Sequence, residues 1–402
     1  MHYTLYSYRY LHLKDSRQQA PRGDPNYDPL YKLRPLVDMC HHNFLARYIP
    51  ARDMSIDEAM VKFKGRVFFR QYMPKKPTKW GIKVWMLAES KTGYVSNFDV
   101  YLGKAPPSGQ AELGMVTRVV LDISRPFHNS HRHLYFDNFF NSAVLLEELL
   151  KVGTCTYGCG TLRPDRYPGP YKVGRSAIKL RPGEIWQLQK GNLVATVWFD
   201  KRQVAILSTN CQPDEKVTVQ RRTKEPPYMK EVDIPAPTSI YNKHMGGVDL
   251  SDQMRSYYPS GRPGKKWWRY LLWFLLDVSI CNAFVLERLS LHATSSRSRR
   301  SLLHFKLELA KQLIGGFSGR KRYPGRKRKF ASHDNAVALP NLPGHQQVQF
   351  QGRKRACVQC SNHGQKTPSG RTPETTYGCN RCGVNLCRNS CFLHYHTENS
   401  HI

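Results

Sequence analysis

Three short acidic motifs, far apart in the chain, contain the residue types that hold divalent metal ions. They are Ser-Ile-Asp-Glu at 55–58, Tyr-Phe-Asp-Asn at 135–138 and Gly-Gly-Val-Asp-Leu-Ser-Asp-Gln at 246–253. Carboxylates that are packed together repel one another unless a cation lies between them. Mg²⁺ prefers oxygen ligands and keeps positions for water and phosphate oxygens. The motifs therefore predict a metal site that acts on a phosphate-containing substrate.

Such a site suits in-line displacement at phosphorus. Two ions about 3.5–4 Å apart stabilise the attacking and leaving oxygens, and they can activate water or a sugar 3′-hydroxyl. The candidate ligands are Asp57, Asp137 and Asp249, with Asp252 beside the third. Each aspartate alone is a weak signal, because this residue often caps a helix or lies on a surface. The prediction depends on their joint occurrence.

The net charge favours nucleic acid as the substrate. The 402 residues include 62 Lys and Arg against 30 Asp and Glu, a formal net charge of +32. A charge this large attracts polyanions, and contacts of Lys and Arg with phosphate make the binding salt-dependent. A basic protein of the ribosomal kind is the alternative. The most apolar window, 267–286, contains Arg269, Asp277 and Asn282, so we interpret it as a buried helix rather than a membrane span.

The elements that must position the first two motifs follow one another in a regular order. Strand patterns occupy 54–63, 81–88, 94–102, 133–136 and 154–161, and helix patterns occupy 113–123 and 143–151. This order predicts an α/β fold with a mixed sheet flanked by helices. If the first and fourth strands lie side by side, Asp57 and Asp137 are neighbours. A helix that begins near Asp249 then completes the cluster.

The remainder of the chain has a different composition. Residues 162–235 are rich in Pro, Gly and basic residues, with strand patterns at 193–199 and 203–207, and predict a β-rich insertion. Helical patterns follow at 247–291 and 297–313. The linker after them has seven basic residues in ten at 320–329, which favours a nuclear import signal or a DNA clamp over a solvated tail. We assign DNA binding there to Arg320, Lys321 and Arg322.

Two further basic segments are candidates for DNA contact. Lys265, Lys266 and Arg269 flank two tryptophans, and this pattern can bind phosphate and stack on bases. Packing of both tryptophans into the core is the favoured interpretation of the rings. The lysines near the second strand either line a DNA groove or form a solvated face; they are Lys75, Lys76, Lys79 and Lys83.

Six of the eleven cysteines form three pairs near the C-terminus, followed by histidines. The pattern is Cys357-x2-Cys360, Cys379-x2-Cys382, Cys387-x3-Cys391, then His394, His396 and His401. Thiolate pairs at this spacing suit tetrahedral zinc, and six Cys with two His fill two structural sites. A short segment with little core would fold around the metal. We expect a cross-braced arrangement, in which the first and third pairs share one ion and the second pair shares the other with two histidines. A protein-binding finger is the competing interpretation.

As a set, these motifs resemble those of the piggyBac-type transposases, from about residue 5 to the end. The matching segments are Met54-Ser55-Ile56-Asp57-Glu58, Lys64-Gly65-Arg66, Pro74-Lys75-Lys76-Pro77, Trp80-Gly81-Ile82-Lys83, Phe136-Asp137-Asn138-Phe139-Phe140, Gly246-Gly247-Val248-Asp249 and Asp252-Gln253-Met254.

The resemblance implies an RNase H-like catalytic core in which Asp57, Asp137 and Asp249 hold two Mg²⁺ ions and Asp252 is a further acidic residue. It implies cut-and-paste DNA transposition in the nucleus: nicking, attack of the 3′-hydroxyl to form a hairpin, and integration at TTAA. It also implies a zinc domain that binds the transposon end, with two Zn²⁺ ions. His396 matches the family's pattern there, and we assign the eighth ligand to His394, with His401 as the alternative. A homodimer, or a dimer with a full-length relative, is expected.

On this basis the chain is expected to divide into seven segments. They are a partial helical dimerisation and DNA-binding segment (1–50), the first part of the catalytic core (51–161), a β-rich insertion (162–238), the last part of the core (239–290), a second helical segment (291–314), a basic linker (315–352) and the Cys/His zinc domain (353–402). Family members usually carry a long region ahead of these segments, so we expect an N-terminally truncated enzyme. A domesticated, catalytically unproductive DNA-binding protein is the alternative.

Overall fold

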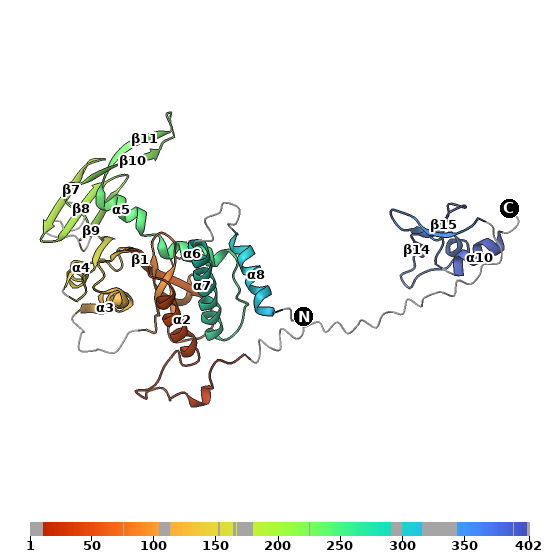
Figure 1. Ribbon diagram of the computed structural model, residues 1–402, viewed down its shortest axis with the longest axis horizontal. Helices are drawn as coiled ribbons and strands as arrows, with labels where there is room; N and C mark the ends of the chain where they lie inside the picture. Colours follow the sequence, from red (N-terminus) through yellow and green to blue (C-terminus); the bar gives the residue numbers. More distant parts are fainter. Residues whose placement is uncertain are drawn as a thin grey trace. The chain divides into compact units, whose positions relative to one another are not determined.

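The computed structural model describes residues 11–74, 76–103, 113–151, 153–163, 166, 180–224, 226–290, 300–315, 344–388 and 390–399. The chain divides into two compact units, Met1–Gly315 and Gly316–Ile402. The first unit has a large mixed sheet with helices on both faces, and the second consists of short strands and helices (Figure 1).

Within the described residues, nine strands of the first unit form one sheet. Their order is β2-β3-β1-β5-β6-β9-β8-β7, and β4 pairs with β3 beside this path. The strands are β1 (Asp53–Lys62), β2 (Arg70–Tyr72), β3 (Trp80–Glu89), β4 (Val95–Val100), β5 (His133–Phe136), β6 (Tyr157–Thr161), β7 (Ile185–Lys190), β8 (Leu193–Phe199) and β9 (Gln203–Ser208). The predicted mixed sheet is confirmed, with the short β2 as an addition.

The centre of the sheet is formed by β3, β1 and β5. Strand β3 is buried from Gly81 to Glu89, which is typical of a strand covered on both faces. It pairs antiparallel with β1, whereas β1 pairs parallel with β5 so that Ile56 lies opposite Phe136. The first and fourth predicted strands are therefore adjacent, as expected.

Helices cover both faces of this sheet. On one face α2 (Arg34–Arg47), α6 (Gly247–Tyr257) and α7 (Trp267–Leu289) share a core with alternate residues of β1 and β3. The opposite face is covered by α3 (Gly114–Ser124) and α4 (Ala143–Leu150). The short helices η1 and η3 span Ser16–Gln18 and Arg125–Phe127, and α5 spans Ala236–His244. Tyr241 of α5 packs against Tyr135, Cys159 and Ile206.

Helix α7 is the apolar window that the sequence places in the core. By length and composition it could cross a membrane, but half of that window is buried inside the unit. Trp268 is 4% exposed, and Trp267 packs edge-on against Phe69 with 5.1 Å between ring centroids. The side chain of Asn282 donates to the carbonyl of Val95 and accepts from its N–H, so a polar residue fastens the helix to β4. The core interpretation of both tryptophans is confirmed.

Two regions differ from the sequence-based expectation. Strands β8 and β9, predicted to belong to a β-rich insertion, extend the main sheet because β9 pairs with the free edge of β6. Strands β10 (Lys216–Arg222) and β11 (Met229–Pro235) form a separate two-stranded ribbon.

The helical stretch predicted at 247–291 is divided into α6 and α7. Residues between the two helices include Pro259, Gly261, Pro263 and Gly264, which disfavour a continuous helix. Helix α8 (Leu302–Ile314) then begins at Ser301, whose hydroxyl accepts from the N–H of His304. Of the helical segment predicted at 1–50, residues 1–10 lie outside the described residues, residues 11–13 are not helical, and α2 lies at Arg34–Arg47.

The second unit has a small core made largely of cysteines. Its buried residues include Cys357, Cys360, Cys379, Leu386 and Phe392. Its elements are β12 (Gln347–Gln349), β13 (Arg355–Ala356), α9 (Val358–Asn362), β14 (Glu374–Thr375), β15 (Tyr377–Cys379) and α10 (Ser390–Glu398). So little apolar surface favours a fold that depends on metal.

Candidate metal centres

The sheet places the first two predicted aspartates next to each other. Asp57 and Asp137 directly follow the register pair Ile56 and Phe136 on adjacent parallel strands, and such strands lie about 4.8 Å apart. The N–H of Glu58 donates to Asp57 Oδ1 at 2.7 Å, and the N–H of Phe139 donates to Asp137 Oδ1 at 2.8 Å. Backbone hydrogen bonds therefore orient both carboxylates.

Helix α6 docks directly on β1 and brings the third motif to the same face. The N–H of Val248 donates to Ser55 Oγ at 3.2 Å. A Cβ on Gly247 would lie 2.6 Å from Ser55 Oγ and 2.7 Å from the carbonyl oxygen of Glu89, so the approach requires glycine. Asp249 lies in the first turn of this helix.

The β3–β4 turn fixes the other side of the helix. Gly93 has φ +72°, and a Cβ there would lie 3.0 Å from Leu250 Cγ. The turn and the helix thus fit together only because Gly93 has no side chain. Asp249 is exposed, whereas Asp252 is partly buried and forms an ion pair with Arg255 Nη2 at 3.1 Å.

Burial and mutual repulsion shape the electrostatics of this acidic site. Burial, helped by the charge of Glu58, raises the pKa of Asp57 to about 8. Burial also raises the pKa of Asp137 and of Asp252, with further contributions from Glu58 and Asp249 respectively. Lys76 lowers the pKa of all three carboxyls, with its Nζ 4.0 Å from Asp57 Oδ2 and 3.8 Å from Glu58 Oε1. A cation in this site therefore favours the ionised carboxylates.

The donor atoms of the acidic site fit a hard divalent cation. Carboxylate oxygens are the ligands that Mg²⁺ prefers, and Glu58 Oε2 is buried without a hydrogen-bond donor among the described residues. Among the described residues, Asp57, Asp137 and Asp249 do not form a group whose ligand atoms all lie within 4.8 Å of one another. At least two of these three carboxylates therefore have their oxygens more than 4.8 Å apart.

The first cysteine group has the geometry of a tetrahedral metal site. Ligand atoms of Cys357, Cys360, Cys387 and Cys391 all lie within 4.8 Å of one another. Cys360 Sγ is 3.8 Å from Cys387 Sγ and 3.5 Å from Cys391 Sγ. Zinc–sulfur bonds of about 2.3 Å in a tetrahedron separate the sulfurs by about 3.8 Å. The structure thus brings together the first and third cysteine pairs, as predicted.

The second group joins the middle cysteine pair to two histidines. Its members are Cys379, Cys382, His396 and His345, with ligand atoms within 4.8 Å of one another. His396 Nε2 is 3.5 Å from Cys382 Sγ, and its Nδ1 lies 2.7 Å from the carbonyl oxygen of Phe392. A ring N–H that donates to a carbonyl orients the other nitrogen toward a metal.

The fourth member of the second group corrects the sequence-based assignment. His345 Nδ1 lies 3.4 Å from Cys379 Sγ and 3.3 Å from Cys382 Sγ. His394 is exposed and is not in the group, and His401 lies outside the described residues. The reason is strand pairing: β12 pairs with β15 so that Gln347 faces Cys379, which brings His345 to the metal-binding cysteines. His345 lies within the linker predicted at 315–352. The alternating Gln-Val-Gln segment after it is the feature of the sequence that indicates the strand β12.

The predicted DNA-binding residues have different environments. Lys265 and Lys266 are exposed ahead of α7. Arg269 is 9% exposed and its guanidinium lies 5.3 Å from the Trp268 ring, so the prediction that it binds DNA conflicts with its burial. The helical repeat turns it inward with Trp268. The assigned residues Arg320, Lys321 and Arg322 lie outside the described residues.

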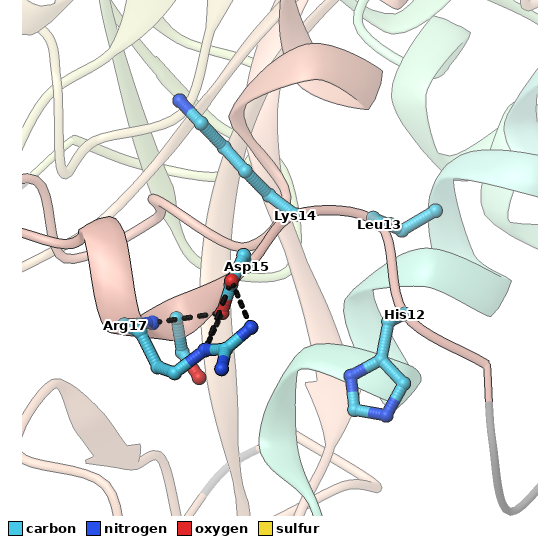
Figure 2. A pocket seen from close by; sticks show the side chains of 6 residues that line it. His12, Leu13, Lys14, Asp15 and Arg17 are labelled. Carbon is cyan, nitrogen blue, oxygen red and sulfur yellow. Dashed lines mark hydrogen bonds and ion pairs between the residues drawn. The ribbon is translucent and has the colours of Figure 1, made fainter.

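A surface pocket near the start of the described chain is separate from these centres. It is lined by residues 12–17, where Asp15 accepts hydrogen bonds from Arg17 (Figure 2). The carboxylate is already paired, and none of the predicted site residues lines this pocket. We assign it no chemical role.

Comparison with known proteins gives consistent matches. A family model described as Transposase IS4 matches residues 8–284. Human PiggyBac transposable element-derived protein 3 is 28% identical over 395 residues, which cover 96% of this chain and 62% of the relative. Human PiggyBac transposable element-derived protein 2 is 25% identical over 297 residues, covering 70% of this chain and 47% of the relative. The chain thus spans less than two thirds of the length of these relatives.

A solved structure supports the same assignment at the level of the fold. The cryo-EM structure of a piggyBac transposase synaptic complex with hairpin DNA superimposes with a TM-score of 0.66 at 26% sequence identity. The match covers 96% of this chain and 79% of that chain. The mixed α/β fold described above is therefore similar to that of a DNA-bound transposase.

Proposed function

The chain belongs to the piggyBac-type transposase family, and on that premise we propose that it cleaves and joins DNA strands in a divalent-ion-dependent reaction. Its substrates would be transposon ends and TTAA targets. The observation that carries the proposal is the parallel register of β1 and β5, which places Asp57 and Asp137 side by side. Helix α6, docked on β1 at Ser55, carries Asp249 in its first turn and Asp252 one turn further on.

We propose further that the core is RNase H-like. In this arrangement, β1 has an antiparallel neighbour, β3, on one side and parallel β5 on the other, with β6 parallel beyond it. Helices on both faces support the same assignment. Asp57, in the middle of β1, and Asp137, directly after β5, would then lie next to each other on neighbouring central strands.

In this proposal each residue has a defined role. Asp57, Asp137 and Asp249 would hold two Mg²⁺ ions, and Asp252, paired with Arg255, would support them. When bound, the ions would polarise the scissile phosphate and favour ionisation of the attacking water or 3′-hydroxyl. The carboxylates would fix the positions of the ions, and the basic surface that includes Lys265 and Lys266 would hold the flanking phosphate backbone.

The second unit would complete the enzyme. Two Zn²⁺ ions, one in each Cys/His group, would hold its fold. We propose that this unit binds transposon-end DNA and that the enzyme acts in the nucleus as a homodimer or with a longer relative. Support comes from the net charge of +32 and from the similarity to a piggyBac transposase that was solved as a complex with hairpin DNA.

The direct test is strand cleavage in vitro. Incubation with duplex DNA that carries TTAA-flanked transposon ends should give nicked and hairpin products with Mg²⁺ and none in chelator. Asp137→Asn should reduce these products to background. Asp122→Asn is the matched control, because Asp122 lies exposed on α3 and pairs with Arg125. Activity that survives Asp137→Asn would refute the assignment.

A domesticated, transposon-derived DNA-binding protein is the second candidate. Two matched human proteins are described as transposable element-derived, which gives this candidate its support. It predicts that the protein binds transposon-end DNA in gel-shift assays and yields no strand cleavage with Mg²⁺ or Mn²⁺. Excision assays in cells, with and without a full-length relative, separate the two candidates.

A further inference from the structure

One lysine interacts electrostatically with carboxylates from three separate elements of the acidic site. Lys76, in the loop between β2 and β3, has its Nζ 4.0 Å from Asp57 Oδ2 and 3.8 Å from Glu58 Oε1. The same ammonium donates to the carbonyl oxygen of Glu58 at 3.4 Å. It also acts electrostatically on Asp137 after β5 and on Asp252 of α6. A partly exposed cation therefore lies near several of the proposed metal ligands.

The contacts of Lys76 are those of a shared cation rather than a fixed ion pair. Hydrogen-bonded ammonium–carboxylate pairs have N–O distances of about 2.7–2.9 Å. Elsewhere in the chain Lys306 Nζ approaches Asp277 Oδ1 to 3.0 Å, and both of those side chains are nearly buried. The side chain of Lys76 is 33% exposed, and its distances to both carboxylates are longer. It can therefore leave the site without breaking a close ion pair.

The neighbouring Lys83 shows what an anchored lysine looks like in this site. Lys83 is 8% exposed, and its Nζ lies 3.6 Å from the ring centroid of Trp85 and 4.5 Å from that of Phe139. The aromatic rings hold this ammonium in place. Lys76 has a loop position and solvent access instead, so the two lysines near Asp57 have different freedom to move.

We propose that Lys76 is a tethered cation that competes with divalent ions for the acidic site and is released from the carboxylates when such ions bind. The inference rests on the proposed function, because it requires Asp57 to be a metal ligand. A divalent ion bound to Asp57 and the ammonium of Lys76 would lie beside the same carboxylate, and Coulomb repulsion between the two cations disfavours their simultaneous presence. The flexible four-carbon stem of lysine allows the charge to move toward solvent or a DNA phosphate.

The first test measures metal affinity without activity. Mg²⁺ is titrated calorimetrically into the zinc-loaded full chain, and Lys76→Gln should lower the Kd for Mg²⁺ by about tenfold, the effect of removing one partly screened charge at this distance. Lys76→Arg should keep the wild-type Kd, since it keeps the charge. Lys79→Gln, an exposed lysine of the same loop, is the matched control and should also keep it.

The outcomes separate this inference from the proposed function. Suppose that Asp57→Asn weakens Mg²⁺ binding but Lys76→Gln leaves the affinity unchanged or lowers it. This result overturns the competition by Lys76 and leaves the proposed metal site standing. If Asp57→Asn leaves the Mg²⁺ affinity of the wild-type chain unchanged, Asp57 is not a metal ligand, and both the proposed metal site and the competition by Lys76 are overturned.

A second measurement uses the wild-type chain and does not depend on a variant that folds. Amine-reactive labelling followed by peptide mass spectrometry reports the accessibility of each lysine. Mg²⁺ should raise the labelling of Lys76 several-fold relative to Lys79, because the ammonium leaves the carboxylates. Labelling of Lys76 that stays constant or falls when Mg²⁺ is added contradicts the proposal.

Discussion

The two candidate metal centres are built in opposite ways. The Cys/His groups lie within one unit between His345 and His396, and each brings four ligand atoms within 4.8 Å of one another. The proposed acidic site would draw Asp57 from β1, Asp137 from the end of β5 and Asp249 from α6, over almost two hundred residues of sequence. In the first centre the ligands form much of the core, whereas in the second they lie at the edge of large apolar cores.

The two centres draw their stability from different sources. A unit whose core consists largely of cysteines depends on metal for its fold. The acidic site is held by sheet register and helix docking, so its scaffold can fold first and accept ions afterwards. Loss of all metal should therefore unfold the second unit, while changes of the scaffold should disturb the acidic site.

Removal of zinc should have the largest effect. A strong chelator at neutral pH should unfold the second unit, because structural zinc contributes about 10–16 kcal/mol in small zinc domains. Limited proteolysis should then cleave within residues 344–399. All seven tryptophans lie in the first unit, so their fluorescence should stay unchanged and serve as the internal control. A protease-resistant second unit in chelator would contradict this comparison.

Replacement of a single zinc ligand should remove one ion and spare the other. His345→Ala should lower the zinc content from two ions per chain to one, since it opens the Cys379, Cys382 and His396 group. His394→Ala is the matched control and should retain two ions, because His394 is exposed outside that group. Elemental analysis of the purified chains by mass spectrometry provides the measurement. Loss of an ion in His394→Ala alone would restore the sequence-based assignment.

A change in the scaffold should disturb the acidic site without touching a ligand. Gly247→Ala places a Cβ 2.6 Å from Ser55 Oγ and 2.7 Å from a backbone oxygen. Such overpacking costs about 1–3 kcal/mol, measured as a lower free energy of unfolding of the first unit in urea. In Gly246→Ala the new Cβ meets nothing within 4 Å, so this control should keep wild-type stability to within about 0.5 kcal/mol. Equal losses in both variants would show that close docking of α6 is unimportant.

The smallest effect concerns pH. The pKa of Asp57 is raised to about 8 in the folded state, so the folded chain prefers the neutral carboxyl. The stabilisation is complete below the ordinary value of 3.8 and is lost as pH rises through 8. Without Mg²⁺, the free energy of unfolding of the first unit should therefore fall between pH 5 and 8, by well under about 1.4 kcal/mol per pH unit for this group, and the melting temperature should fall with it.

Two controls test the origin of that slope. Asp57→Asn should flatten it, because the amide does not titrate. Mg²⁺ should flatten it as well, because a bound cation favours the ionised carboxylate. Tryptophan fluorescence restricts the measurement to the first unit. A slope that both changes leave intact would mean that other groups dominate the pH dependence.

The sequence alone determined the residue types and the elements that present them. Strand-like runs of apolar, β-branched and aromatic residues identified β1, β3 and β5, and the pattern of cysteine pairs predicted which pairs come together. These features are local: strand patterns and Cys-x2-Cys spacings depend on neighbours along the chain. The acidic motifs also predicted the candidate ligands, two of which lie on the adjacent strands β1 and β5 or directly after them.

Tertiary structure decided what depends on contacts between distant segments. The pairing of β12 with β15 brings His345 to the cysteines, and the pairing of β6 with β9 joins a predicted insertion to the main sheet. The position of Lys76 among carboxylates from three elements is likewise invisible in sequence. Each of these follows from backbone hydrogen bonding and packing across many residues, which local periodicity does not encode.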